Sequence, residues 1–294
     1  MNHLHLQTNA NYAVLTFDRE GSSANIFDRP ALVELSEKLD ALAAHPELKG
    51  LLIRSAKPSI FIAGADLKVL STAQGEELRD LIELGQATFE KLAKLPFATI
   101  AAIHGACVGG GFELALACDW RIASDAPATK IGLPETQLGI LPAWGGTTRL
   151  PRLIGLPAAL PLILGGKILG ARAAKAKGLV DAVVAPENLE AFALGYLSKG
   201  KRKVKSHALV NSPVTAPLIE AKAKHDLMAK TRGLYPAQLA ALESQGLGRD
   251  QVRRAGRRGD QRPGGRAGLA VGAARQRELA DGRAAHRLAG LRQP

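Results

Sequence analysis

Apolar and polar positions along the first 190 residues follow two different rhythms. Short apolar or alternating runs predict strands at 11–18, 51–53, 99–103 and 120–123. Between them, apolar residues recur every three or four positions and predict helices with one buried face, formed by Leu32, Leu35, Leu39 and Leu42 and then by Leu78, Leu81, Ile82, Phe89 and Leu92. Asp28 followed by Pro30 is typical of a helix start. Strands alternating with helices predict an α/β fold with parallel strands.

The stretch 98–119 joins a strand to a helix through Gly109, Gly110 and Gly111. Glycines at such a junction let a ligand approach the backbone, and the first turn of the helix leaves N–H groups without an intrahelical acceptor. The only acid near that turn is Glu113. Amide donors beside a carboxylate suit a reaction that passes through an oxyanion and a proton transfer. Taken alone, a glycine run before a helix more often serves close packing.

The composition is typical of a globular protein. Apolar residues make up 46% of the 294 residues and aromatic residues only 4%, which predicts an aliphatic core. We expect neither a membrane span nor a signal peptide, because no apolar run is long enough and the N-terminus has no apolar segment. The two cysteines, Cys107 and Cys118, are expected to be reduced core residues, and the location to be cytoplasmic.

The net charge of +12 is unevenly distributed. Residues 245–294 contain twelve arginines, no lysine and four acids, which leaves only +4 for the rest of the chain. This tail is rich in Arg, Gly and Ala, has no aromatic residue and carries few large apolar side chains, so we predict that it is disordered. A reading-frame change would account for it. An RNA-binding tail is the competing hypothesis, disfavoured by the lack of stacking aromatics.

Five short motifs appear in the order of one known family. They are 61–68 (FIAGADLK), 109–114 (GGGFEL), 132–135 (GLPE), 145–150 (GGTTRL) and 178–181 (GLVD). With them the chain resembles the crotonase superfamily, and within it the enoyl-CoA hydratases, over residues 5 to 190. The resemblance implies a core built as a β-β-α spiral, followed by a helical C-terminal extension. It also implies the hydration of 2-trans-enoyl-CoA to 3-hydroxyacyl-CoA in fatty-acid β-oxidation.

The resemblance also assigns roles to residues. The N–H groups of Ala65 and Gly110 would form the oxyanion hole for the thioester carbonyl. Glu113 and Glu135 would be the two catalytic acids that hold the attacking water. Contacts to coenzyme A would come from Ala63, Gly64, Asp66, Leu67 and Lys68, with Lys57 or Lys68 near the phosphates. Without the family context, Glu113 would be interpreted as a carboxylate of a first helical turn and Glu135 as a loop surface charge.

Two departures from the family pattern bear on these roles. The interval between Glu113 and Glu135 is about two residues longer than in simple hydratases, with a bulge expected at Ala126 and Pro127, and this could displace Glu135. The segment 170–175 lacks the acidic pair that is frequent in the family, which concerns only a surface helix.

Beyond residue 200 three further segments appear, 211–213 (NSP), 222–224 (KAK) and 229–237 (AKTRGLYPA). With them the chain resembles the linker of the multifunctional β-oxidation α-subunit, which continues into a dehydrogenase. After residue 243 no dinucleotide fingerprint follows, so we expect no NAD site, no metal and no cofactor besides the coenzyme A of the substrate. The predicted organisation is a hydratase domain at 1–190, a helical extension at 191–243 and the tail at 244–294. The basic run 199–205 is expected to be a solvated linker.

Three functions stay open on the sequence. The first is the hydratase, and the second is an enoyl-CoA isomerase on the same fold, which usually needs a single acid. The third is an inactive or RNA-binding fragment. Acyl-CoA is the expected small-molecule partner, with a homo-oligomer or a thiolase subunit as protein partner and nucleic acid not expected.

Overall fold

A computed structural model describes residues 3–9, 11–202, 211–212, 214–231 and 237–242. Its large sheet has six strands in the order β1 (Leu4–Thr8), β2 (Tyr12–Phe17), β3 (Gly50–Ser55), β5 (Ala98–Ile103), β7 (Trp120–Ser124) and β10 (Ala182–Val184). Its small sheet has four, in the order β4 (Ile60–Ile62), β6 (Ala106–Val108), β8 (Lys130–Gly132) and β9 (Ile168–Gly170). All neighbouring strands are parallel except for the pairs β1–β2 and β8–β9.

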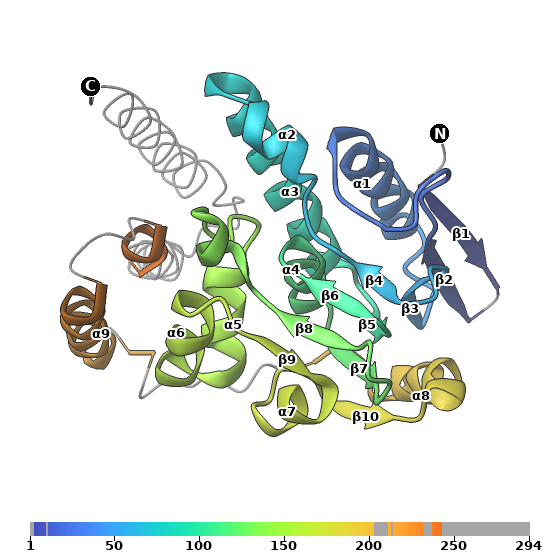
Figure 1. Cartoon of the computed structure of the whole chain (residues 1–294). Coiled ribbons are helices and arrows are strands. Elements are labelled where there is room, and N and C mark those ends of the chain that lie inside the picture. Colours follow the sequence, from blue (N-terminus) through green and yellow to red (C-terminus); the bar gives the residue numbers. More distant parts are fainter. Residues whose placement is uncertain (1–2, 10, 203–210, 213, 232–236, 243–294) are drawn as a thin grey trace.

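The helices complete the layers around the sheets (Figure 1). They are α1 (Arg29–Ala43), α2 (Leu67–Thr72), α3 (Gly75–Lys94), α4 (Gly110–Ala117), α5 (Gly146–Ile154), α6 (Leu156–Leu164), α7 (Ala171–Ala176), α8 (Leu189–Tyr196) and α9 (Thr215–Thr231). Three 3₁₀ turns are η1 (Glu135–Leu138), η2 (Pro186–Asn188) and η3 (Leu197–Lys199). Residues 237–242 are also helical.

The chain repeats one unit three times. In the pairs β3–β4, β5–β6 and β7–β8, the first strand joins the large sheet and the second joins the small sheet. A helical segment follows each pair: α2 and α3, then α4, then η1 and α5. The two sheets therefore grow together, turn by turn, which is the β-β-α spiral that the sequence predicts.

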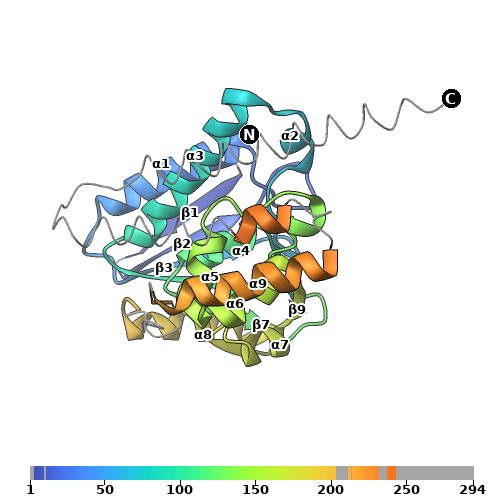
Figure 2. The same ribbon diagram turned by 90° about the vertical axis from the view of Figure 1, so that its left-hand side faces the viewer.

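Local sequence explains the helices on the N-terminal side. Asp28 caps α1 by accepting a hydrogen bond from the Ala31 N–H at 3.0 Å, and Pro30 stands in the first turn, as expected. The apolar faces predicted for α1 and α3 are buried. These helices run side by side across the β1–β3 part of the large sheet (Figure 2).

Aliphatic side chains dominate the core, with a small aromatic group near its centre. The rings of Phe17, Phe27, Phe89 and Trp144 meet edge to face, with centroids 5.4 to 5.8 Å apart. Both cysteines are buried in the core, as expected, and they form no disulfide with each other in the described structure.

The C-terminal part of the described chain packs in two ways. Leu189, Ala193 and Leu197 of α8 and η3 pack on the large sheet, so the predicted domain boundary at 190 falls within an element that covers the core. Ala216 of α9 packs instead against Leu156 and Leu160 of α6. The tail at 244–294 lies outside the described residues.

Two residues of the basic run contact the core. Lys201 Nζ donates to Leu95 O at 2.7 Å, and Arg202 Nη1 forms a 2.5 Å ion pair with Asp181. Lys199 and Lys201 are nevertheless exposed, and residues 203–205 of the run lie outside the described residues. Patterns along the chain do not show which distant acids a basic run will meet.

Candidate active site

The junction between β6 and α4 brings the glycine run against the small sheet. Gly109 adopts a φ of 56°, where a side chain would be strained, and α4 begins directly after it at Gly110. A Cβ on Gly111 would lie 2.2 Å from Ile62 O, so only glycine permits this approach of α4 to β4. The glycines thus allow close packing of α4 and bring the buried first turn of this helix against the small sheet.

The segment after β4 meets the same turn. Gly64 has a φ of 100°, and a Cβ built on it would be 3.5 Å from Gly110 N and 3.1 Å from Val108 O. The neighbouring Ala63 and Asp66 donate their N–H groups to Asn25 O and Phe27 O, both at 2.9 Å. In the described part of the chain, no protein acceptor receives the N–H of Ala65 or of Gly110.

Glu113 points from the first turn of α4 into the protein and is 2% exposed. Its Oε1 accepts the backbone N–H of Trp144 at 2.9 Å and of Gly146 at 2.7 Å. Burial raises the pKa of Glu113 to about 7, although the two N–H groups oppose the shift. The carboxyl group is therefore fixed in position and titrates near neutral pH.

Glu135 begins η1 and is 7% exposed. Neither of its carboxyl oxygens has a hydrogen-bond partner within the described residues. Burial, and after it the negative charge of Glu113, raises the pKa of Glu135 well above its usual range. A buried carboxyl group without partners is costly, which marks a place where function rather than stability selects the residue.

The two acids and the glycine turn are close together. A Cβ on Gly109 would lie 3.3 Å from Glu135 Oε1, and a Cβ on Gly146 would lie 3.0 Å from Glu113 Oε1. At the position of the expected bulge, the Thr129 N–H donates to Ala126 O at 2.9 Å in a turn before β8. Glu135 nevertheless lies close enough to Glu113 to feel its charge.

Trp144 is a site residue for which the sequence predicts no role. Besides its N–H donated to Glu113, its indole lies between α3 and α4, where a Cβ on Gly85 or Gly110 would come within 2.5 Å of the ring. The indole Nε1 is buried without an acceptor in the described chain. A bulky aromatic residue directly before two glycines was the available signal.

The residues predicted to contact coenzyme A divide into two groups. Asp66 caps α2 through the Lys68 N–H at 2.9 Å, and Leu67 (55% exposed) and Lys68 face the solvent. Lys57 lies apart from them, since its Nζ binds Asp18 at 2.6 Å and Arg19 O at 2.8 Å. Of the two candidate lysines, only Lys68 has an exposed ammonium group with no ion pair to an acid in the described region.

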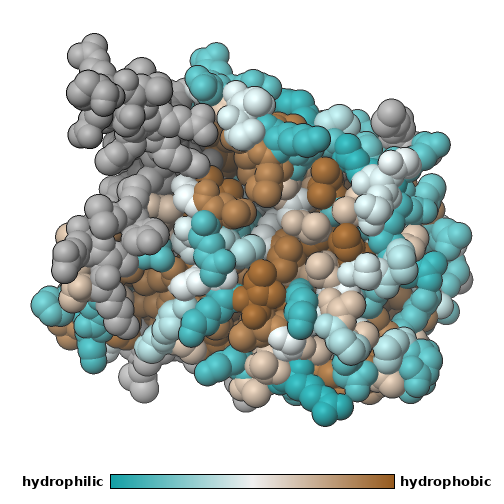
Figure 3. Space-filling model, viewed as in Figure 1, coloured by the Kyte–Doolittle hydropathy of each residue, from teal (hydrophilic) through white to brown (hydrophobic). Residues whose placement is uncertain are grey.

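The surface around these elements is apolar. Figure 3 shows apolar residues gathered across the middle of this face, with hydrophilic residues around them. Exposed Leu67 and Leu138 follow Ala65 by two residues and Glu135 by three. No three His, Cys, Asp or Glu residues of the described chain are placed to hold a metal ion. None of its helices has the length and apolar character needed to cross a membrane.

The chain is similar to a known protein family over most of its length. The family model described as enoyl-CoA hydratase/isomerase matches residues 7–235. The fatty acid oxidation complex subunit alpha of Aliivibrio fischeri is 44% identical over 237 residues, and that of Vibrio cholerae is 45% identical over 242 residues. These matches cover 79% of this chain, but the chain spans only about a third (34%) of the length of these relatives.

Solved structures agree with this relationship. The crystal structure of an enoyl-CoA hydratase from Bacillus anthracis has a TM-score of 0.63 and 30% identity, covering 87% of this chain and 96% of that one. Human mitochondrial delta3-delta2-enoyl-CoA isomerase has a TM-score of 0.64 and 25% identity, covering 87% and 99%. These neighbours confirm the predicted crotonase fold.

Proposed function

Because the chain belongs to the enoyl-CoA hydratase/isomerase family, we propose that it hydrates 2-trans-enoyl-CoA to 3-hydroxyacyl-CoA. The observation that carries the proposal is the pair of buried acids, Glu113 and Glu135, of which the second has no hydrogen-bond partner in the described structure. An isomerase moves one proton and usually needs one acid. Two neighbouring acids instead suit the addition of water, in which one proton is removed and another is supplied.

The environments of the acids assign their roles. Two backbone N–H groups stabilise the carboxylate form of Glu113, whereas Glu135 has no such donors and feels the charge of Glu113. Glu113 is therefore the base and Glu135 the acid. Glu113 removes a proton from water, whose oxygen forms the bond to C3, and Glu135 delivers its proton to C2. After the addition, Glu113 carries the proton taken from water and Glu135 is ionised. Proton exchange with solvent then restores an ionised Glu113 and a protonated Glu135.

The unused N–H groups of Ala65 and Gly110 would stabilise the enolate oxygen that the thioester carbonyl becomes during this addition. The closeness of Gly64 to Gly110 N supports their action on one oxygen atom. The backbone of Ala63 to Leu67 would bind the adenine end of coenzyme A, and exposed Lys68 would approach its phosphates. Since Lys57 is already paired with Asp18, we assign it no phosphate contact.

The test is hydration of crotonyl-CoA by the purified protein, measured as the decrease in absorbance of the enoyl group. We expect Glu113→Gln and Glu135→Gln each to lower turnover by roughly 10²–10⁴-fold, because a positioned acid or base contributes about that much, and to leave binding of the substrate nearly unchanged. Glu37→Gln, at an exposed position of α1, is the matched control and should keep full activity. Turnover of a 3-enoyl-CoA that survives Glu135→Gln would establish the isomerase instead.

The similarity to subunits of a fatty acid oxidation complex extends the proposal to protein partners. Since those relatives are named as complex subunits, we propose that this chain associates with a thiolase subunit or with itself. We place the reaction in the cytoplasm, as the sequence predicts. Co-purification of the tagged chain with a thiolase from the same cells would support the first association, and a monomer in sedimentation would exclude the second.

A further inference from the structure

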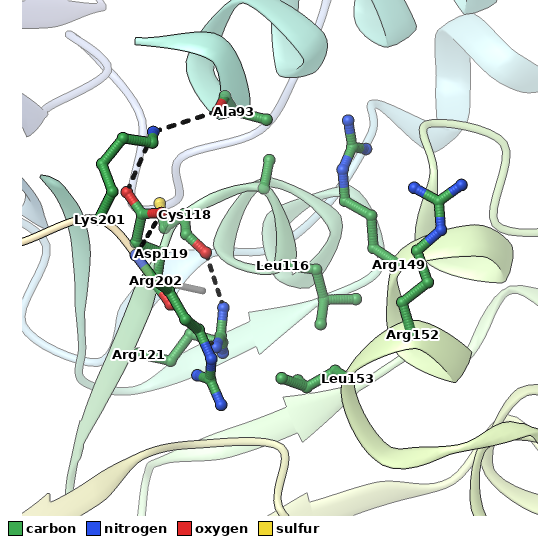
Figure 4. A pocket seen from close by; sticks show the side chains of 11 residues that line it. Ala93, Leu116, Cys118, Asp119, Arg121, Arg149, Arg152, Leu153, Lys201 and Arg202 are labelled. Atoms are coloured by element: carbon green, nitrogen blue, oxygen red, sulfur yellow. Dashed lines mark hydrogen bonds and ion pairs between the residues drawn. The ribbon is translucent and has the colours of Figure 1, made fainter. Parts of the chain in front are cut away.

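A second concave site lies at the opposite end of α4 from the two acids. It is a cavity of about 250 Å³ next to Leu116, Ala117 and Cys118, which end the helix, whereas Glu113 is in its first turn. Figure 4 shows Arg149 and Arg152 on one side of the cavity and Arg121, Arg202 and Lys201 on the other. We call it the basic pocket.

Part of the charge in the basic pocket has a structural purpose. Arg121 Nη1 donates to Cys118 O at 2.8 Å and to Ala115 O at 3.2 Å, at the negative end of α4. Its Nη2 forms a 3.1 Å ion pair with Asp181, which also binds Arg202. Lys201 approaches Asp119 at 3.4 Å. These contacts account for the side of the pocket formed by β7 and the basic run.

On the other side of the basic pocket, Arg149 has an acidic partner and Arg152 has none in the described residues. Arg149 donates to Trp144 O at 2.9 Å and pairs with Glu90 at 3.1 Å, away from the end of α4. Arg152, one helical turn further along α5, is exposed and has no ion pair within the described residues. Of the five cationic side chains, four have an acidic partner, namely Asp119, Asp181 or Glu90, and Arg152 has none in the described region.

Two further observations show that the pocket lacks negative charge. The Nε of Arg121, a side chain that is 2% exposed, is buried and has no acceptor in the described protein. Burial lowers the pKa of Arg121, and the like charge of Arg202 acts in the same direction. Burial also lowers the pKa of Arg149, although the charges of Glu90 and Glu113 oppose this shift, and the like charge of Arg152 adds to the lowering. Neighbouring cations that destabilise one another in a partly dry cavity favour a bound anion.

We propose that the basic pocket binds a small dianion of the phosphate type, separately from the substrate. Guanidinium groups present paired N–H donors that match the oxygens of phosphate, and charge-assisted hydrogen bonds of this kind are the strong ones. The unpaired guanidinium of Arg152 and the Nε of Arg121, which has no acceptor in the described chain, are donors available to such an anion. The cavity volume exceeds that of several water molecules, each about 30 Å³, so a hydrated tetrahedral oxyanion fits.

The test is calorimetric titration of the full-length chain with inorganic phosphate, at constant ionic strength set by chloride. The variant is Arg152→Ala, which leaves no acid unpaired and should keep the melting temperature measured without phosphate. We expect it to weaken phosphate binding by about tenfold or more, the value of one hydrogen bond to a charged group. Arg172→Ala is the matched control, since Arg172 is 86% exposed on α7 and outside the pocket. The twelve arginines of the tail are present in every variant.

Unchanged phosphate affinity in Arg152→Ala, or an equal loss in Arg172→Ala, would overturn the proposal. The source of the phosphate group is tested by repeating the titration with saturating coenzyme A. Binding that persists shows a separate site, whereas displacement would mean that the pocket receives the phosphates of coenzyme A. Glu113→Gln should bind phosphate normally, so the outcome does not depend on hydratase activity.

Discussion

Replacing Glu113 by glutamine should stabilise the protein at alkaline pH while it removes activity. The amide oxygen of glutamine can accept the same two N–H groups, from Trp144 and Gly146, that now hold Oε1 at 2.9 and 2.7 Å. What the substitution removes is the buried negative charge. If the carboxylate of Glu113 were required for structure, its replacement would instead lower the free energy of unfolding.

The magnitude follows from the pKa of Glu113, which burial raises from 4.5 to about 7. At 1.36 kcal/mol for each pKa unit, the ionised group costs about 3 kcal/mol of unfolding free energy above pH 7. The folded state holds its proton at pH values where the unfolded chain has released it, so stability falls as pH rises from 4.5 to about 7. Between pH 5.5 and pH 8 this group alone should lower the unfolding free energy by about 2 kcal/mol.

The assay is urea unfolding of the wild type, Glu113→Gln and the exposed control Glu37→Gln at pH 5.5 and pH 8. We expect Glu113→Gln to be the more stable protein at pH 8 by up to about 3 kcal/mol, with a smaller advantage at pH 5.5. The control should follow the wild type at both pH values. A Glu113→Gln protein that is less stable than the wild type at pH 8 would show that the carboxylate is structurally required, and the reasoning about its pKa would fail.

Three other substitutions and one truncation test the remaining features. Gly110→Ala places a methyl group 2.5 Å from the Trp144 ring, so we expect a loss of about 1–3 kcal/mol and a lower melting temperature; an unchanged melting temperature would mean that the indole moves freely. Lys68→Ala should raise the KM for crotonyl-CoA with kcat unchanged, whereas Lys57→Ala should mainly lower the melting temperature because Lys57 pairs with Asp18. The opposite pattern in these kinetics would assign the phosphate contact to Lys57. Truncation after Glu243 should leave melting temperature and hydration rate unchanged, because the tail has few large apolar residues to offset the cost of ordering it; a loss of either would show that the tail packs.

Much of the fold is encoded locally and could be predicted. The N-cap at Asp28 and the apolar face of α3 each depend on residues within or next to one helix. The strand-to-helix junction at Gly109 is also local, and α4 begins directly after it at Gly110. Local patterns identify the elements, and the family motifs supply their arrangement.

The site itself depends on contacts between segments far apart in the chain. Glu113 is held by N–H groups 31 and 33 residues further on. The isolation of the Glu135 carboxyl group is a property of the space around it, which no spacing of residues reveals. In the same way, the basic run at Lys201 and Arg202 meets Asp119 and Asp181 only through the folded core. The roles of the acids, the oxyanion hole and the coenzyme A contacts stay predictions until the variants are measured.

The strand order of the large sheet has a consequence for how the protein is made. From β2 to β10, every strand of the large sheet pairs with a neighbour that precedes it in the chain. On the ribosome, each new strand therefore finds its partner already synthesised, and the sheet can grow along one edge as the chain emerges. Glu113 gains its second backbone donor only after residue 146 has left the exit tunnel. Catalytic competence would thus arise late in synthesis, on a scaffold whose first strands are already paired.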